Sequence, residues 1–330
     1  MREPLAKLWN IENEEIPLYL SIEKKLPMMN DILKPLLDDD YFGGAPNSTA
    51  KLTSRFQDRN NLAKSFTPKY CMGYINSEIN NIIIASCNET RNETSNTAFI
   101  NAINDRMYFP IFTYYNCFNT TNHYASSLNN MNFEKRNNKD KQILAGDGLY
   151  SYKEKTKPGK VLFIFIHGIQ QHSQLKLGEM SIHSLEPMDF GLININIKDI
   201  QPVPSVMNTD SERYKELPID DIISVSSNGA HLCLSGVLSH VKCGYVAALN
   251  GFTSNGVYFR DNIFVVNLRS FLGDSGGPIF HYKSLTQVSL NGIVQGGLFD
   301  FNDNINGITG VITIGSILNV FKDLEVVTNS

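Results

Sequence analysis

The six residues Gly273-Asp274-Ser275-Gly276-Gly277-Pro278 constrain this chain more than any other stretch. They lie between two runs typical of strands, 263–268 and 288–294. The glycines allow a sharp turn in which two N–H groups, those of Gly273 and Ser275, point at one developing negative oxygen. The motif therefore predicts Ser275 as a nucleophile, with the Gly273 and Ser275 amides as its oxyanion hole; a glycine-rich surface turn is the alternative.

The same six residues surround the catalytic serine of the chymotrypsin-like serine proteases, which this chain resembles. The resemblance implies an all-β fold with two six-stranded antiparallel β-barrels, and the streptogrisin and alpha-lytic branch is the most similar. It also implies a serine endopeptidase that cleaves a peptide or protein substrate and needs no metal or cofactor. The alternative is a catalytically inactive homologue that binds peptide or protein.

Composition disfavours several other classes. The 330 residues are 42% hydrophobic, enough for one large core or two modest ones. With 29 basic and 33 acidic residues the net charge is −4, so we expect no nucleic-acid or membrane partner. We also expect a monomer. The longest purely apolar run, 161–166, is far too short to cross a bilayer. The start, MREPLAKLWNIENEEIP, lacks the apolar run of a secretory signal peptide.

Three parts are expected along the chain. Residues 1–45 form a helical segment, because apolar residues recur there at three- and four-residue spacing, and they resemble a protease pro-region. Residues 66–200 form the N-terminal barrel with a long Asn-rich insertion, 88–159, of loops or partly disordered chain. Residues 201–330 form the C-terminal barrel, and its first residues, 201–204, contain two prolines typical of a linker.

The acid of a catalytic triad has one candidate. Asp189 stands immediately before the alternating strand 192–197, in a context similar to that of the aspartate in the protease family, and it precedes Ser275 as the family order requires. Its implied role is to orient a base.

The catalytic histidine is missing from its expected motif. In the family it precedes a cysteine in the sequence T-A-x-H-C, whereas this chain has I-A-S-C ending at Cys87. The alignment places Ser86 or Cys87 at the histidine position, and neither supplies an imidazole. Four histidines precede Asp189 and remain candidates for the base: His123, His167, His172 and His183.

The five cysteines suggest two disulfides. Cys71 and Cys87 bracket a hairpin pattern, and a cysteine pair in this place in the family implies that they are joined. Cys233 and Cys243 lie ten residues apart across a Ser-Gly turn, a spacing that closes a hairpin. Cys117 has no evident partner.

Zinc is the competing interpretation of the second cysteine pair. His231 and His240 lie near Cys233 and Cys243, but the short spacing of a zinc knuckle is absent. A disulfide favours an oxidising, extracellular location. Four N-glycosylation sequons are weak support for secretion: Asn47, Asn88, Asn92 and Asn119.

Two features complete the resemblance. The run Gln295-Gly296-Gly297 ends a strand similar to the one that holds substrate backbone in the family, where a serine usually stands in place of Gln295. A terminal helix is expected to begin with Ser316 as its cap. Its apolar residues would be Ile317, Val320, Phe321 and Leu324.

Overall fold

The computed structural model describes residues 46–76, 79, 81–106, 109–118, 142–145, 178–185, 188–195, 201–208, 211–271, 273–301 and 306–329. The expected pro-region-like segment, 1–45, and the expected strand 161–166 lie outside these residues. No helix in the described ranges combines the length and the apolar character needed to cross a membrane.

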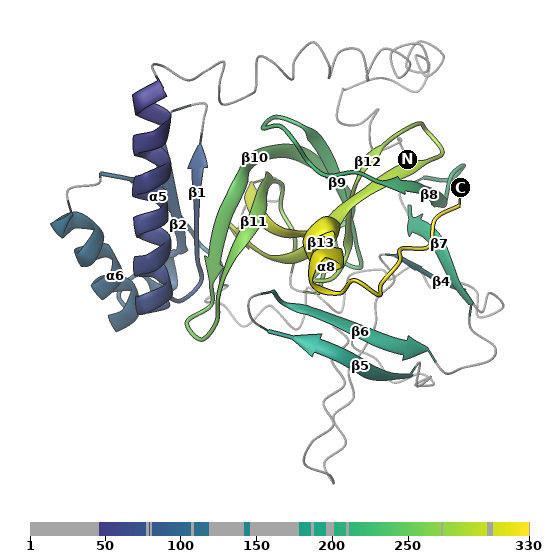
Figure 1. The fold of residues 1–330 in the computed structure, drawn as a ribbon, viewed down its shortest axis with the longest axis horizontal. Helices are drawn as coiled ribbons and strands as arrows, with labels where there is room; N and C mark the ends of the chain where they lie inside the picture. The colour runs from purple at the N-terminus through teal and green to yellow at the C-terminus, as the bar shows by residue number, and fades with distance from the viewer. Residues whose placement is uncertain are drawn as a thin grey trace, which may run out of the picture.

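Six strands close into a barrel, drawn in green and yellow in Figure 1. Each pairs antiparallel with its neighbours, and the last returns to the first. The all-β class is therefore confirmed. Around the barrel the strands are β9 (His231–Gly236), β10 (His240–Ser254), β11 (Phe259–Asn267), β14 (Gly307–Thr313), β13 (Val288–Phe299) and β12 (Pro278–Tyr282).

Strand β11 shows how the barrel is buried on both faces. Successive side chains of a strand point to opposite sides of the sheet. Phe264 and Val266 accordingly pack with Leu234 and Val294 in one core. Val265, between them, packs on the other face in a separate cluster that includes Met72 from β1. A near-continuous apolar run such as this one is typical of a strand covered on both sides.

A smaller unit of helices and strands joins the barrel through β10. Strand β1 pairs antiparallel with both β10 and β2, and β2 pairs parallel with β3. Helix α5 lies along β1 and β2 with α6 beyond it (Figure 1). A shared core of Phe56, Phe99, Ile103 and Phe252 holds the unit together. Its elements are α5 (Pro46–Phe66), β1 (Cys71–Asn76), β2 (Asn81–Cys87), η2 (Asn88–Thr90), α6 (Thr94–Asp105) and β3 (Ile111–Tyr115).

This unit differs from the sequence prediction in two ways. The stretch predicted as loops, 88–159, contains α6, which buries Asn96, Phe99 and Ile103 at helical spacing. Helix α6 also makes the connection between two parallel strands, where antiparallel hairpins were expected. The described strands between residues 66 and 200 do not close a barrel of their own, and the predicted N-terminal barrel stays a prediction.

The remaining strands extend the barrel sheet or form a hairpin. Strand β8 pairs parallel with β13 and antiparallel with β7, β7 pairs parallel with β4, and β5 and β6 make a separate pair. Residues 201–204 belong to a strand, so the linker prediction was wrong. Pro202 is in register with Ile143 of β4, whereas pairing with β8 begins only at Ser205, so on the β8 side no ladder hydrogen bond is lost at the prolines. The bounds are β4 (Gln142–Ala145), β5 (Gly178–Ser184), β6 (Phe190–Ile195), β7 (Gln201–Met207) and β8 (Glu216–Ile222).

Helix α8 (Ile314–Val320) follows the last strand and is shorter than predicted. Its cap is Thr313, whose hydroxyl accepts the Ser316 N–H at 2.9 Å, so Ser316 lies in the first turn and is not the cap. Ile317 is buried, whereas Val320 is 57% exposed at the helix end. The apolar spacing in the sequence therefore overestimated the length of the helix.

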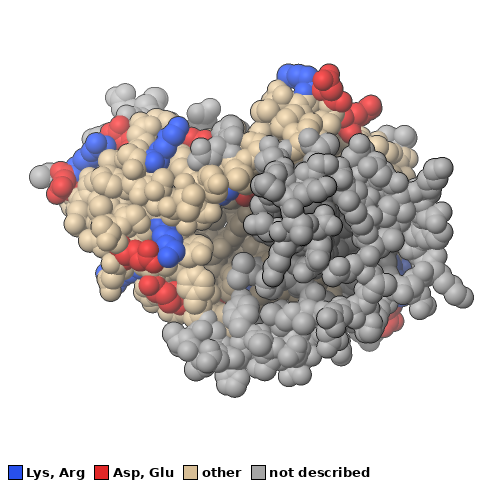
Figure 2. All heavy atoms as spheres, turned by 90° about the horizontal axis from the view of Figure 1, so that it is seen from below, with Lys and Arg blue, Asp and Glu red and all other residues tan. Residues whose placement is uncertain are grey.

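Charged side chains do not gather by sign on the face shown in Figure 2, where blue and red residues of the described part lie interspersed. This agrees with a net charge of −4 from nearly equal numbers of basic and acidic residues.

Candidate active site

The turn that carries Ser275 has two residues in the left-handed region. Gly273 has φ +113° and Gly276 has φ +84°. A side chain at either position would strain the backbone. Ser275 therefore lies on a turn that requires both flanking glycines, as the motif predicts.

The backbone amides of this turn fall into two groups. The N–H groups of Asp274, Gly276 and Gly277 each donate to a carbonyl oxygen at 2.8 to 3.0 Å. Those of Gly273 and Ser275 have no acceptor among the described residues. The half-buried Ser275 hydroxyl likewise has no partner within that part of the chain. The unpaired amides are the two that the sequence assigns to an oxyanion hole.

The side chain of Asp274 holds the turn in place through hydrogen bonds. Its carboxylate is 1% exposed and accepts the N–H groups of Leu238, Ser239 and Phe271 at 3.0, 3.2 and 2.7 Å. The Ser239 hydroxyl donates to it as well. A Cβ on Gly236 would lie 2.3 Å from this carboxylate, so only glycine fits there. A buried carboxylate with this many donors holds the turn in one conformation.

The other side of the turn is fixed to β13. The Gly276 N–H donates to the Val294 carbonyl at 2.8 Å, and the Val294 N–H donates to the Gly277 carbonyl at 2.9 Å. These two bonds place the predicted substrate-binding residues, which follow Val294, beside Ser275.

The predicted substrate-binding residues have different surroundings. A Cβ on Gly297 would lie 2.6 Å from Ser270 Oγ, so the backbone there approaches its neighbour closely. A Cβ on Gly296 would meet no atom of the described residues within 4 Å. The Gln295 side chain accepts a hydrogen bond from the Thr253 hydroxyl at 2.8 Å. The residues that follow Val294 therefore supply unobstructed backbone at Gly296 and the side-chain amide of Gln295.

Asp189 has a guanidinium partner. Arg260 Nη2 lies 2.9 Å from its Oδ2, and the Arg260 side chain is 5% exposed. Burial raises the pKa of Asp189 above its usual value, and the Arg260 charge opposes that rise. Among the histidines whose side chains the structure describes, none contacts Asp189. Its role in orienting a base stays a prediction.

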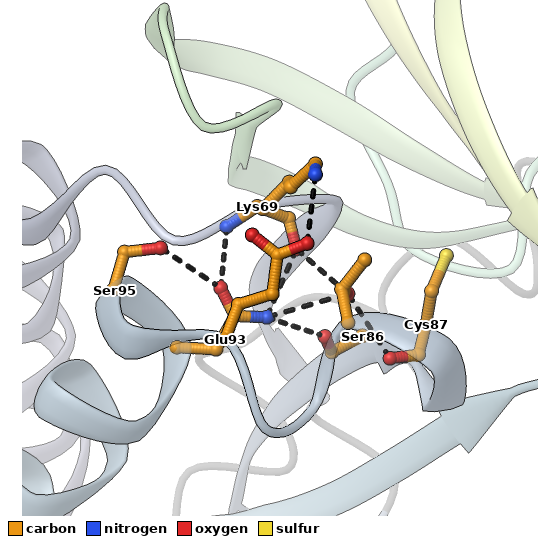
Figure 3. A network of polar contacts seen from close by, with 7 residues as sticks. Lys69, Ser86, Cys87, Glu93 and Ser95 are labelled. Atoms are coloured by element: carbon orange, nitrogen blue, oxygen red, sulfur yellow. Dashed lines mark hydrogen bonds and ion pairs between the residues drawn. The ribbon is translucent and has the colours of Figure 1, made fainter.

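The position expected for the histidine is part of a different network (Figure 3). Ser86 is 7% exposed, and its hydroxyl accepts from Asn96 Nδ2 at 3.4 Å. Asn96 Oδ1 accepts the Lys69 N–H at 2.6 Å, and Nδ2 also donates to the Lys69 carbonyl and to Thr90. Lys69 in turn forms an ion pair with Glu93. This network ties the start of β1 to α6 and supplies no base.

The side chains of the four candidate bases all lie outside the described residues. His123, His167 and His172 lie outside the described residues, and His183 lies on β5 with its side chain outside them. The three other histidines follow Asp189 in the sequence: His231, His240 and His281.

The first disulfide prediction was wrong. Cys71 pairs with Ser86 in the β1–β2 ladder, so Cys87, one residue further, faces the opposite side of the sheet. Cys87 is instead joined to Cys117, which lies two residues past its ladder partner Tyr115. Cys71 is free and buried, and burial raises the pKa of its thiol to about 12.

The second disulfide is confirmed. Cys233 and Cys243 are directly paired in the β9–β10 hairpin and are joined. Both sulfurs are thereby used, although His231 lies close enough for the three to be grouped as potential metal ligands. Burial lowers the pKa of His231 to about 4, and the neighbouring His281 adds to this effect.

Three residues of the site region were not found from the sequence: Thr253, Arg260 and Asn96. Thr253 and Arg260 form a cross-strand pair on β10 and β11, which brings the partner of Asp189 next to the partner of Gln295. Only the register of two long strands reveals this. Asn96 had one available signal, its helical spacing from Phe99 and Ile103.

Solved structures of chymotrypsin-like bacterial serine proteases are similar to this chain. Thermobifida fusca Protease A has a TM-score of 0.40 and 22% identity, over 46% of this chain and 75% of its own. Cellulomonas bogoriensis chymotrypsin has a TM-score of 0.40 and 18% identity, over 46% and 76%. An alpha-lytic protease homologue has a TM-score of 0.36 and 16% identity, over 44% and 71%. No protein-family model matches the sequence, and no curated protein matches it.

Proposed function

We propose that this protein is a serine-type endopeptidase in which Ser275 is the nucleophile. The observation that carries the proposal is the pair of amides, Gly273 and Ser275, that have no acceptor among the described residues, whereas the N–H groups of Asp274, Gly276 and Gly277 are bonded. Donors that are fixed in place before the reaction stabilise a developing oxyanion without reorganisation. A merely structural turn has no need to leave alternate amides without acceptors.

In the proposed reaction Ser275 Oγ bonds to the peptide carbonyl carbon as its proton passes to a base. The carbonyl oxygen becomes an oxyanion between the Gly273 and Ser275 amides, and the C–N bond then breaks as the amine takes up the proton. Water hydrolyses the resulting ester. The base would be one of the four upstream histidines, because an alcohol is scarcely ionised at neutral pH.

The test is labelling of the purified full-length protein with an alkyl fluorophosphonate, which reacts with activated serines. We expect labelling of the wild type and none of Ser275→Ala. The exposed Ser226, changed to alanine, is the matched control and should label as the wild type does. A folded wild type that is not labelled would contradict the proposal.

A second candidate is a homologue that binds peptide without hydrolysis. Two observations favour it: Ser86 lies in a closed polar network, and Asp189 is paired with Arg260. Without a histidine, a serine protease loses about a million-fold in kcat. Peptide binding by an unlabelled, folded protein would support this candidate.

We also propose an extracellular location, since the structure contains two disulfides. Disulfides persist in oxidising compartments. Detection of the protein in medium or in cell extract would test this directly.

A further inference from the structure

Gln295 occupies a distinctive place beside the Ser275 turn. It lies at an irregularity in β13, between Val294 and Gly296, where the pairing with β14 shifts by one residue. Such bulges re-aim a side chain relative to its strand. Val294 is bonded to the turn through both its N–H and its carbonyl. Gln295 therefore directly follows the residue of β13 that is hydrogen-bonded to the Ser275 turn.

Thr253 orients the amide of this side chain. The Thr253 hydroxyl on β10 donates to Gln295 Oε1 at 2.8 Å, which turns the oxygen toward β10. The Nε2 group has no partner among the described residues and is not one of their buried unpaired atoms. Within the described part of the chain, the unpaired end of Gln295 is thus a donor with two N–H bonds and no acceptor.

Open space adjoins this donor. Cβ atoms built on Gly296 and on Gly276 meet nothing in the described part of the chain within 4 Å. Gly276 donates one of the two bonds that join the turn to Val294, and Gly296 lies two residues beyond Val294 on β13. Among the described residues, the backbone next to Ser275 and the backbone next to Gln295 are therefore both unobstructed at these glycines.

We propose that Gln295 Nε2 donates a hydrogen bond to a glutamine or glutamate side chain of the peptide, and that Thr253 is the positioning residue that aims it. The proposal rests on the peptide-binding function assigned above to the Ser275 turn. A group that can only donate selects side chains with acceptor oxygens and gains nothing from apolar ones. Thr253 acts only through Gln295.

The test compares two fluorescent peptide libraries that differ at one fixed position, glutamine in one and leucine in the other. Fluorescence anisotropy with full-length Ser275→Ala protein gives each affinity without turnover. We expect the glutamine library to bind about tenfold more tightly, since one well-placed hydrogen bond has about that effect. Thr253→Val and Gln295→Leu, each added to Ser275→Ala, should remove the preference, whereas Thr253→Ser should retain it.

Each other outcome is decisive. Equal affinity for both libraries, in a protein whose wild type is labelled at Ser275, would overturn the substrate preference and leave the proposed function standing. An equal loss for both libraries in Gln295→Leu would show that the amide bonds the peptide backbone, which also overturns it. Neither labelling nor binding would overturn both proposals. A urea unfolding midpoint for Thr253→Val with Ser275→Ala equal to that of Ser275→Ala alone would show that the variant keeps its fold.

Discussion

Two buried polar side chains organise the two halves of this molecule in opposite ways. Asp274, in the barrel, fixes the Ser275 turn by accepting the amides of Leu238, Ser239 and Phe271, while the Gly273 and Ser275 amides have no acceptor among the described residues. Asn96, in the helical unit, uses both ends of its amide on Lys69, Ser86 and Thr90. One arrangement keeps donors available for a ligand, and the other closes its network completely. We expect this difference if the barrel carries the proposed reaction and the helical unit has a structural role.

The largest expected effect comes from removing the Asp274 carboxylate in the barrel. Asp274→Ala leaves three backbone N–H groups and the Ser239 hydroxyl without their acceptor, and we expect the free energy of unfolding to fall by about 4 kcal/mol. Fluorophosphonate labelling of Ser275 should be lost with it. Urea unfolding measures the first effect, with the exposed Asp323→Ala as control. Wild-type stability in Asp274→Ala would show that the carboxylate does not hold the turn.

Acid should weaken the barrel before the helical unit. The pKa of His231 is about 4, below its ordinary 6.5, because burial disfavours the charged ring. Its stabilising contribution is therefore complete above pH 6.5 and is lost as the pH falls toward 4, by about 3 kcal/mol over that window. His231→Phe should remove this part of the pH dependence, and His240→Asn should not. Residues 46–118 contain no histidine, so hydrogen exchange should show earlier opening in the barrel.

Asn96→Ala tests the helical side. It removes a side chain that is 3% exposed and leaves the Lys69 N–H without its acceptor and the Ser86 hydroxyl without its donor, so we expect a loss of about 2 kcal/mol in unfolding free energy. Labelling of Ser275 should stay at the wild-type level. Asn101→Ala, on the exposed face of the same helix, is the matched control. Loss of labelling in a folded Asn96→Ala protein would contradict the structural role.

The smallest effect concerns the contact between Asp189 and Arg260. A double-mutant cycle with Asp189→Asn and Arg260→Met should give a coupling of about 1 kcal/mol, because the aspartate is 32% exposed.

Burial raises the pKa of Asp189 above 3.8, so stability from this group is present at lower pH and decreases as the pH rises through the folded-state value. Asp189→Asn should remove that decrease. A coupling near zero would show that Asp189 acts mainly through another partner.

Local chemistry was predictable from the sequence, and long-range register was not. The Ser275 turn and the Cys233–Cys243 disulfide follow from residues close together in the chain, and both were correct in the features that the structure tests. The partner of Cys87 depends on which face of β2 it occupies, and this is set by a pairing that spacing alone does not reveal. Arg260 and Thr253 required the register of β10 and β11 in the same way.

The prediction of loops in the Asn-rich region was wrong for a different reason. Helix α6 is built largely from Asn, Thr and Ser, which have modest helix propensity, and its apolar face rests on two residues, Phe99 and Ile103. Tertiary packing against Phe252 of β10 supplies what propensity lacks. Composition therefore pointed to loops, and the contact that overrides composition comes from the other half of the chain.

Strand β10 imposes an order on folding. Its last residues pair with β1, so that Cys71 faces Ser254, a residue more than half the length of the chain away in sequence. During synthesis β1 and β2 leave the ribosome before β10 has been made. The edge of β1 that pairs with β10 is therefore unpaired until then. Contacts this distant in sequence form slowly and leave edges open to wrong partners. The helical unit would thus complete its assembly last, although it is made first.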